Sequence, residues 1–327
     1  IFKEIPLKDP YIIERLVYGP FSSFESAKHA SKLFEKNGLN PVIANPKDWE
    51  LWLPIDKKDQ INKNFKLKKI SIKKLTIPYL VNAFTYQKLD GPISINSFED
   101  FKINNINFGK NFFLVRDSYG SWTLIQKISF EKYLKGVIPH EIGSNSPIEA
   151  LKAQAVIART WAFYNSNRFR VDKFHLCVTT QCQVYKPSKK YKNIDDAIIS
   201  TKNQILVFNN KPINAFYHAS NGGITAKASE SWSLNDYPYL ISKYDLRKSL
   251  KIKISKFKRN ELKQFLKYDN DIFFGNKHYL FRWERMVSND RIQDLLLRNN
   301  LILQNMKIKS LNVVERGPSG RVTKLKV

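Results

Sequence analysis

The sequence predicts an α+β fold, and three patterns support that prediction. Short β-prone runs separated by Asn, Gly and Asp turns fill residues 93–128 and indicate an antiparallel sheet. Helical periodicity follows, most clearly over residues 147–164 and again over 260–267 and 288–298, where a capping residue precedes each helix. The order strand, helix, strand over residues 1–54 predicts a small α/β module at the N-terminus.

The domain boundaries follow from the periodicity of the chain. Ser23 can cap a helix over residues 23–36, and an Asn-Gly pair after it forms a natural stop. Residues 55–74 are rich in lysine with little periodicity, which predicts an exposed linker, and an apolar strand-like pattern returns over residues 75–84. We therefore predict a module over residues 1–54, a linker and connecting strand over 55–92, and a larger domain over 93–327.

The composition limits the classes of function. The chain has 327 residues, with 55 Lys and Arg against 29 Asp and Glu, a formal net charge of +26. Such a charge attracts any polyanion, yet the basic residues are scattered and no zinc-finger, RNP or phosphate-loop pattern occurs, so nucleic-acid binding is not expected. No run approaches the roughly 20 apolar residues of a membrane span. Since the sequence begins at Ile1 rather than Met, a membrane anchor is expected only in a segment removed upstream.

Two adjacent motifs carry the strongest functional signal. Residues 131–142 read EKYLKGVIPHEI, and residues 147–160 read PIEALKAQAVIART. They closely resemble the SpoIID (sporulation stage II protein D) family, whose pattern is E-x-Y-L-x-G-V-(V/I)-P-x-E-M followed by P-x-E-A-L-K-A-Q-A-V-x-A-R-T. The departure is Ile142 where Met is usual, a change of similar volume that should leave the site intact.

Downstream segments follow the same family in order. They read CQVY at residues 182–185, YHASNGGIT at 217–225 and RGPSGRV at 316–322. The resemblance runs from about residue 93 to 327, and because the family usually continues a little further, the chain is expected to lack its closing strands. It implies a SpoIID-type catalytic domain of antiparallel sheet and helices, located outside the cytoplasm in the cell envelope.

The resemblance implies a lytic transglycosylase, with the family's catalytic Glu at Glu141. Such an enzyme cleaves the MurNAc–GlcNAc bonds of peptidoglycan without water and leaves anhydro-muramyl ends, so one carboxyl group serves as acid and base, whereas ordinary glycosidases use two. From the residues alone, Glu141 would be an ordinary exposed Glu in a short loop after Pro139. Glu149 follows Ser146 and Pro147, which predicts a capping box and a structural role.

Further substrate-binding residues are expected on the helix and in the downstream segments. Gln154 and Arg159 lie off the apolar stripe of the helix over 147–164, and Arg159 could pair with a muramyl lactyl carboxylate or with a protein acid. The glycines at 222 and 223 let backbone approach a sugar closely or form a plain turn, and the resemblance favours a cleft wall. The other residues expected to bind substrate are Gln183, Tyr185, Tyr217, His218, Ser220, Gly222, Gly223 and Thr225.

The two cysteines and a nearby histidine form the other chemical cluster. His175, Cys177 and Cys182 could supply three of the four tetrahedral ligands of zinc, with His218 as a candidate fourth. For His218 alone, a hydrogen-bonded role in a cleft is the more ordinary one. Some SpoIID proteins carry zinc through cysteines that precede the same Gln-Val-Tyr motif. The alternative is a disulfide, which an oxidising envelope permits; zinc is favoured, and no other cofactor is expected.

The N-terminal module resembles half of a sporulation-related repeat (SPOR) domain. The resemblance rests on Gly19, Pro20, Phe21, Ser23, Ala27 and Trp52. Such domains bind glycan strands, so the module is expected to add affinity for the wall without chemistry. A second class of function remains open, a non-catalytic glycan-binding amidase enhancer that acts on autolysins with a wall amidase as partner. The presence of Glu141 favours catalysis over this alternative.

Overall fold

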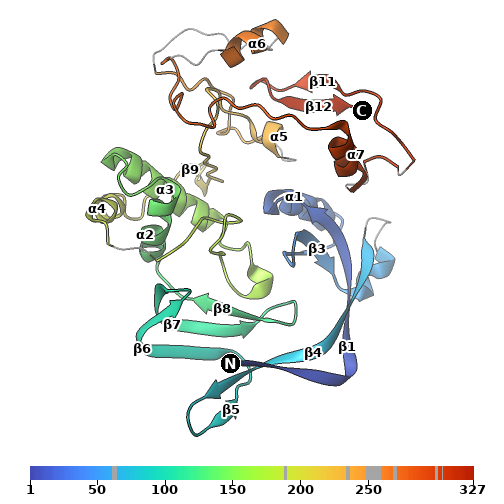
Figure 1. Cartoon of the computed structure of the whole chain (residues 1–327), viewed down its shortest axis with the longest axis vertical. Coiled ribbons are helices and arrows are strands. Elements are labelled where there is room, and N and C mark those ends of the chain that lie inside the picture. Colours follow the sequence, from blue (N-terminus) through green and yellow to red (C-terminus); the bar gives the residue numbers. More distant parts are fainter. Residues whose placement is uncertain are drawn as a thin grey trace. The chain divides into compact units, whose positions relative to one another are not determined.

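The structure, a computed structural model, describes residues 1–60, 65–187, 190–232, 236–247, 259–267, 271–298, 301–303 and 305–327. The chain divides into two compact units, Ile1–Phe216 and Tyr217–Val327 (Figure 1). Its helices and antiparallel strands confirm the α+β class. Among the described residues, no helix is both long enough and apolar enough to cross a membrane.

The first unit opens with a five-stranded sheet and one helix. The strands are β1 (Phe2–Phe21), β2 (Val42–Ala44), β3 (Trp49–Leu53), β4 (Lys66–Val81) and β5 (Tyr86–Lys88), in the antiparallel order β2-β3-β1-β4-β5. Helix α1 (Phe24–Glu35) follows β1. The expected cap is confirmed, because Ser23 Oγ accepts a hydrogen bond from the Ser26 N–H group at 3.1 Å. Phe24 and Ala27 of α1 are buried in the core beside Trp49.

Strand β4 occupies much of the segment in which the sequence predicts an exposed linker. Residues 55–74 instead contain a short 3₁₀ helix, Ile55–Gln60, and β4 from Lys66 onward. β4 pairs with β1 along most of its length, and Lys74 Nζ lies 2.9 Å from Glu4 Oε2 across that pair. Most of its side chains are exposed, so backbone hydrogen bonds rather than apolar burial hold the strand. A strand of this kind leaves a weak apolar pattern, which is why the sequence prediction is wrong here.

The rest of the first unit contains a second sheet and the helices that carry the motifs. Strands β6 (Ile93–Ile103), β7 (Ile106–Arg116) and β8 (Trp122–Gln126) form an antiparallel sheet, as predicted for residues 93–128. The remaining elements are α2 (Phe130–Glu141), α3 (Ile148–Tyr164), a 3₁₀ turn at Arg170–Asp172, α4 (Lys192–Ser200), β9 (Val207–Phe208) and β10 (Lys211–Pro212). The core between the helices is formed by Leu134, Val137, Ile138, Leu151, Ala155, Ala158, Ile194, Ala197 and Ile198.

Helix α3 begins without the predicted capping box. The N-cap residue is Pro147, which has no side-chain hydrogen bond to the helix. Ser146 Oγ instead donates to the Ile142 carbonyl oxygen at 2.6 Å, at the end of the preceding helix. Glu149 is 77% exposed and pairs with Lys152 at 2.8 Å. The capping-box prediction fails because the turn between α2 and α3 is tight enough for the Ser146 hydroxyl to reach back. A structural rather than catalytic role for Glu149 stays a prediction.

The core of the N-terminal module includes side chains from the motif-bearing part of the chain. Phe169 is 7% exposed and belongs to the same buried cluster as Phe24 and Trp49. The Trp49 and Phe169 ring centroids are 5.2 Å apart. Residues 1–54 therefore share a core with residues far along the chain, and the boundaries at 54 and 92 stay predictions about independent folding.

The second unit is built around a small aromatic core and a terminal hairpin. Its elements are α5 (Ala228–Ser231), α6 (Arg259–Lys267), α7 (Asn289–Arg298), β11 (Asn312–Arg316) and β12 (Val322–Lys326), which confirm the helices predicted over 260–267 and 288–298. The buried core consists of Ile224, Phe265, Phe273 and Phe281. Glu230 of α5 accepts hydrogen bonds from Ser319 N–H at 2.9 Å and from Ser242 Oγ at 2.8 Å, so one carboxylate ties the helix to the hairpin turn.

Candidate active site around Glu141

Glu141 is the last residue of helix α2, not a loop residue as the sequence predicts. The helix continues past Pro139 because a proline in the last turn removes only one intrahelical hydrogen bond, and the Ile142 N–H group still bonds to the Ile138 carbonyl oxygen at 3.1 Å. Glu141 is half-buried beside Ile138, which is fully buried. Its Oε1 atom accepts a hydrogen bond from the Val184 N–H group at 3.0 Å. A backbone donor thus fixes one oxygen of the carboxylate.

The segment that supplies Val184 packs along α2. Gln183 is 1% exposed, and its Oε1 accepts a hydrogen bond from Tyr133 Oη at 3.0 Å. The Tyr133 and Tyr185 rings stack with centroids 5.5 Å apart. A Cβ atom on Gly136 would lie 2.4 Å from the Tyr185 ring, so the glycine is required for space. Lys186 N–H donates to the Gly136 carbonyl oxygen at 3.1 Å. The expected residues Gln183 and Tyr185 therefore lie beside α2, buried, and position the segment that holds Glu141.

Arg159 and Gln154 are buried within the first unit. Arg159 is 4% exposed, and its Nε and Nη2 atoms donate to the two carboxylate oxygens of Glu131 at 3.2 and 3.0 Å, while Nη1 donates to the Gln204 carbonyl oxygen at 3.1 Å. The sequence left two partners open for Arg159, a muramyl lactyl carboxylate and a protein acid. In the structure Arg159 pairs with a protein acid, Glu131. Gln154 is 7% exposed, and its Nε2 atom has no hydrogen-bond partner among the described residues. Helices α2, α3 and α4 pack against one another and share one core, and both side chains are buried within this part of the chain.

The glycine loop of the second unit is closed by the protein itself. Gly222 and Gly223 have φ values of +66° and +95°, which favour glycine, and a Cβ atom on Gly223 would lie 2.9 Å from the Phe273 ring. Thr225 Oγ1 donates to the Ile241 carbonyl oxygen at 2.7 Å. The Phe273 ring therefore lies where a side chain on residue 223 would point, and Thr225 has a partner in the protein. Substrate binding by this loop stays a prediction.

The other residues expected to bind substrate in this loop are more open. Ser220 Oγ accepts a hydrogen bond from the Gly222 N–H group at 3.3 Å, and His218 is exposed. Arg321, from the third downstream motif, donates to the Asn221 carbonyl oxygen at 3.0 Å and so fixes the loop to the terminal hairpin. Tyr217 begins the second unit, whereas Glu141 and its partners belong to the first, and each set is assembled within its own unit.

The expected zinc ligands are not assembled. The Sγ atoms of Cys177 and Cys182 are 2.6 Å apart, whereas two thiolates on one tetrahedral zinc, at about 2.3 Å from the metal, lie about 3.8 Å apart. His175 is exposed, and over the described parts of the chain no three His, Cys, Asp or Glu side chains form a group that could hold a metal ion. When both cysteines are thiols, their mutual hydrogen bond lowers the pKa of Cys177 to about 6. Burial raises the pKa of Cys182. This geometry does not fit zinc.

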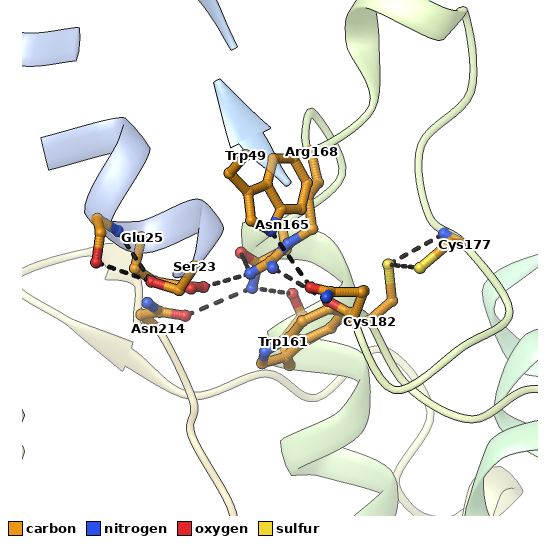
Figure 2. A network of polar contacts seen from close by, with 11 residues as sticks. Ser23, Glu25, Trp49, Trp161, Asn165, Arg168, Cys177, Cys182 and Asn214 are labelled. Atoms are coloured by element: carbon orange, nitrogen blue, oxygen red, sulfur yellow. Dashed lines mark hydrogen bonds and ion pairs between the residues drawn. The ribbon is translucent and has the colours of Figure 1, made fainter. Parts of the chain in front are cut away.

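A buried arginine connects the N-terminal module to the loop that carries the cysteines. Arg168 is 4% exposed and pairs with Glu25 of α1 through Nη2, which also donates to Asn165 Oδ1 at 3.0 Å (Figure 2). Its Nη1 donates to the Gln181 carbonyl oxygen at 3.1 Å. The guanidinium also lies 5.0 Å from the Trp161 ring centroid. Sequence analysis missed this pair because no local spacing relates residues so far apart in the chain.

Comparison with known proteins identifies two regions. Residues 118–208 match the family model "SpoIID: Stage II sporulation protein", and residues 226–327 match a domain of unknown function (DUF8618). These regions begin at residue 118, so the SPOR-like character of residues 1–54 stays a prediction.

Several proteins of known sequence are similar to part of this chain. The amidase enhancer of Bacillus subtilis is 41% identical over 114 residues, 35% of this chain and 15% of that protein. Stage II sporulation protein D of Bacillus subtilis is 35% identical over 134 residues, 36% of this chain and 39% of that protein. An uncharacterised protein of Brachyspira hyodysenteriae is 34% identical over 148 residues, 43% of this chain and 39% of its own length. The chain thus spans well under half the length of these relatives. Residues 118–208, which contain the motifs around Glu141, thus match the SpoIID family model and lie in a chain that is similar in part to SpoIID-type proteins.

Proposed function

We propose that this chain is a lytic transglycosylase that cleaves the MurNAc–GlcNAc bonds of bacterial peptidoglycan, with Glu141 as general acid and base. The observation that carries the proposal is the setting of Glu141. The resemblance to the SpoIID motif implies the catalytic role for this residue, which lies within the matched region, and the Val184 N–H group holds its carboxylate at 3.0 Å. The Glu141 side chain is half-buried, so it is partly shielded from water.

The reaction needs one carboxyl group. Protonated Glu141 gives its proton to the glycosidic oxygen, the bond from that oxygen to the muramic C1 atom breaks, and GlcNAc leaves with a new hydroxyl group. The carboxylate then takes the proton of the same muramic sugar's primary hydroxyl group as its oxygen bonds to C1. This step forms the anhydro end, restores the acid and consumes no water. Val184 occupies Oε1, and Oε2, which has no hydrogen-bond partner among the described residues, is left for proton transfer.

The proposed substrate also sets the location and partners. Peptidoglycan lies outside the cytoplasm, so we place the chain in the cell envelope with glycan strands as its binding partner. A net charge of +26 favours contact with an anionic wall. The proposed chemistry uses no metal.

The test is Glu141→Gln, which keeps the size of the side chain and removes the proton that it transfers. Mass analysis of muropeptides from purified glycan strands should show anhydro ends with the unaltered chain and a loss of rate of about 10²–10⁴-fold in the variant, the range typical of general acid–base catalysis. Pelleting with insoluble glycan should be unchanged. Glu149→Gln is the matched control, because that side chain is 77% exposed and should leave the rate unaltered. Near-full formation of anhydro ends by Glu141→Gln would refute the mechanism.

A second candidate function follows from the relative named amidase enhancer. In that case the chain would bind glycan and increase the activity of a wall amidase without cleaving strands itself. The absence of anhydro ends from purified glycan, combined with faster release of stem peptides by an added amidase, would favour this function. Glu141→Gln should then leave the enhancement intact.

A further inference from the structure

The loop between Cys177 and Cys182 brings together the only two cysteines of the chain. Their Sγ atoms are 2.6 Å apart, inside the contact distance of two unbonded sulfur atoms and close to the S–S bond of about 2.05 Å. The separation is also shorter than the roughly 3.8 Å expected for two thiolates on one zinc. We propose that Cys177 and Cys182 form a disulfide within this loop, in place of a metal site, and that the disulfide positions the segment that holds Glu141.

The backbone of the loop already has the shape that this bond requires. Cys177 N–H donates to Cys182 Sγ at 3.0 Å, and Cys182 N–H donates to the Thr179 carbonyl oxygen at 2.9 Å. Tyr185, which follows the turn, donates its N–H group to the carbonyl oxygen of Val178 within the turn at 3.2 Å. The chain therefore reverses direction between the two cysteines, which keeps their Sγ atoms close together.

The sulfur atoms are sheltered by the N-terminal module. Both cysteines are half-buried and pack against the cluster that contains Trp49 and Phe169. On the other side of the loop, the Trp49 indole N–H group donates to Gln181 Oε1 at 3.3 Å. Residues 1–54 thus contact the loop from outside, and the disulfide would hold it from within. Figure 2 shows Cys177 and Cys182 side by side, joined by a dashed line that marks their hydrogen bond.

The bond would act on the active site because the loop leads directly into the segment along α2. Cys182 is followed by Gln183, which bonds to Tyr133, and by Val184, which bonds to Glu141. A disulfide that closes so short a ring removes little entropy from the unfolded chain, so its main effect is local. We expect it to limit the motion of the Val184 N–H group relative to the carboxylate.

The chemistry is a thiol–disulfide exchange with an external disulfide. One cysteine thiolate attacks a sulfur of the oxidant and forms a mixed disulfide, and the second thiolate then displaces that partner as the Cys177–Cys182 bond forms. The two cysteines together lose two electrons and two protons, and the oxidant gains them as two thiols. The oxidant is a small-molecule disulfide or the disulfide of a thiol oxidoreductase, both of which suit an oxidising envelope.

The first test counts thiols and does not depend on any glycan chemistry. The full chain is reduced, exposed to excess oxidised glutathione, denatured and alkylated. Intact mass should show a chain lighter by two hydrogens with no alkylated cysteine, and the reduced chain should carry two alkyl groups. Elemental analysis of protein purified without chelator should show no zinc. Two alkylated cysteines after oxidation, or stoichiometric zinc, would overturn the proposal.

The second test measures the effect on the site. Hydrogen exchange at the Val184 amide should become at least several-fold faster when the disulfide is reduced, and a Cys177→Ser, Cys182→Ser double variant should show no response to reductant. Unchanged exchange in the reduced chain would refute the positioning role. The cleavage rate, which rests on the function proposed above, should fall on reduction only in the cysteine-containing chain. If the chain forms the disulfide but yields no anhydro ends in the oxidised or the reduced state, the lytic transglycosylase proposal is refuted and the disulfide proposal is not.

Discussion

The ion pair between Glu25 and Arg168 predicts a large loss of stability when its acid is neutralised. The two side chains are 11% and 4% exposed, so Glu25→Gln would leave a guanidinium charge without a counter-charge in the interior. Removal of one partner of a buried pair costs about 3–5 kcal/mol. Because the amide oxygen of Gln still accepts a hydrogen bond, and Asn165 and Gln181 still bind the guanidinium, we expect a cost near the lower end, about 3 kcal/mol.

Urea unfolding followed by tryptophan fluorescence is the assay, because Trp49 and Trp161 both lie against Arg168. With an m-value of about 3 kcal/mol/M, the midpoint of the first unit should fall by about 1 M. Glu149→Gln is the control, since its exposed pair with Lys152 is worth less than about 1 kcal/mol.

Two further results would decide the interpretation of this pair. If the neutralised variant lost no more stability than the control, the charge would not be buried in solution and the reasoning would be wrong. Replacing both Glu25 and Arg168 by Met should recover much of the loss, because no unpaired charge remains. By the same argument, deletion of residues 1–54 should destabilise the rest of the first unit, contrary to the expectation that this module only adds affinity for the wall.

Three other perturbations have expected outcomes. Burial raises the pKa of Asp172. Its contribution to the free energy of unfolding is therefore complete below the unfolded pKa of about 3.9 and is lost as pH rises through the folded pKa. Asp172→Asn should make the melting temperature of the first unit depend less on pH above about pH 4. Burial alone would raise the pKa of Glu230, but its hydrogen bonds lower the pKa. Its contribution to stability is therefore present above about pH 4.3 and is lost as pH falls. Glu230→Gln should make the unfolding of the second unit less sensitive to acid, as measured by circular dichroism from about pH 6 to pH 3. Tyr133→Phe leaves the buried Gln183 oxygen without that donor and should lower the free energy of unfolding by about 1–3 kcal/mol in urea, and an unchanged midpoint would show that the contact is not needed.

The parts of the fold that the sequence predicts correctly depend on local patterns. The sheet over residues 93–128, helix α3 and the second-unit helices each have their own periodicity or capping residues. Glu141 can be identified as the candidate catalytic residue from the sequence because the motif is continuous, even though the sequence predicts a loop at this position. A proline in the last helical turn is tolerated, and sequence rules that end helices at proline do not distinguish that case.

The parts that could not be predicted depend on contacts between distant segments. The partner of Arg159 is Glu131, at the start of the preceding helix, and no spacing rule favours it over a ligand carboxylate. The fit of Phe273 against Gly223 likewise appears only in three dimensions. For the cysteines, residue type and spacing permit both zinc and a disulfide, and the proposal of a disulfide depends on the positions of the Sγ atoms and of His175, which the sequence does not give.

The close approach of Tyr185 to Gly136 has a consequence for how this domain can evolve. No side chain fits at position 136 while the tyrosine ring and the backbone after it remain in place, because the added Cβ atom would clash with the ring and would lie 2.9 Å from the Lys186 carbonyl oxygen. Residues 136 and 185 are therefore coupled by packing, and a larger side chain at position 136 requires a change at position 185. A library built on Gly136→Ala and selected for protease resistance should yield second-site suppressors at Tyr185 with smaller side chains. Such suppressors would also lose the ring that stacks on Tyr133, so the domain would recover its fold before it recovers the geometry around Glu141.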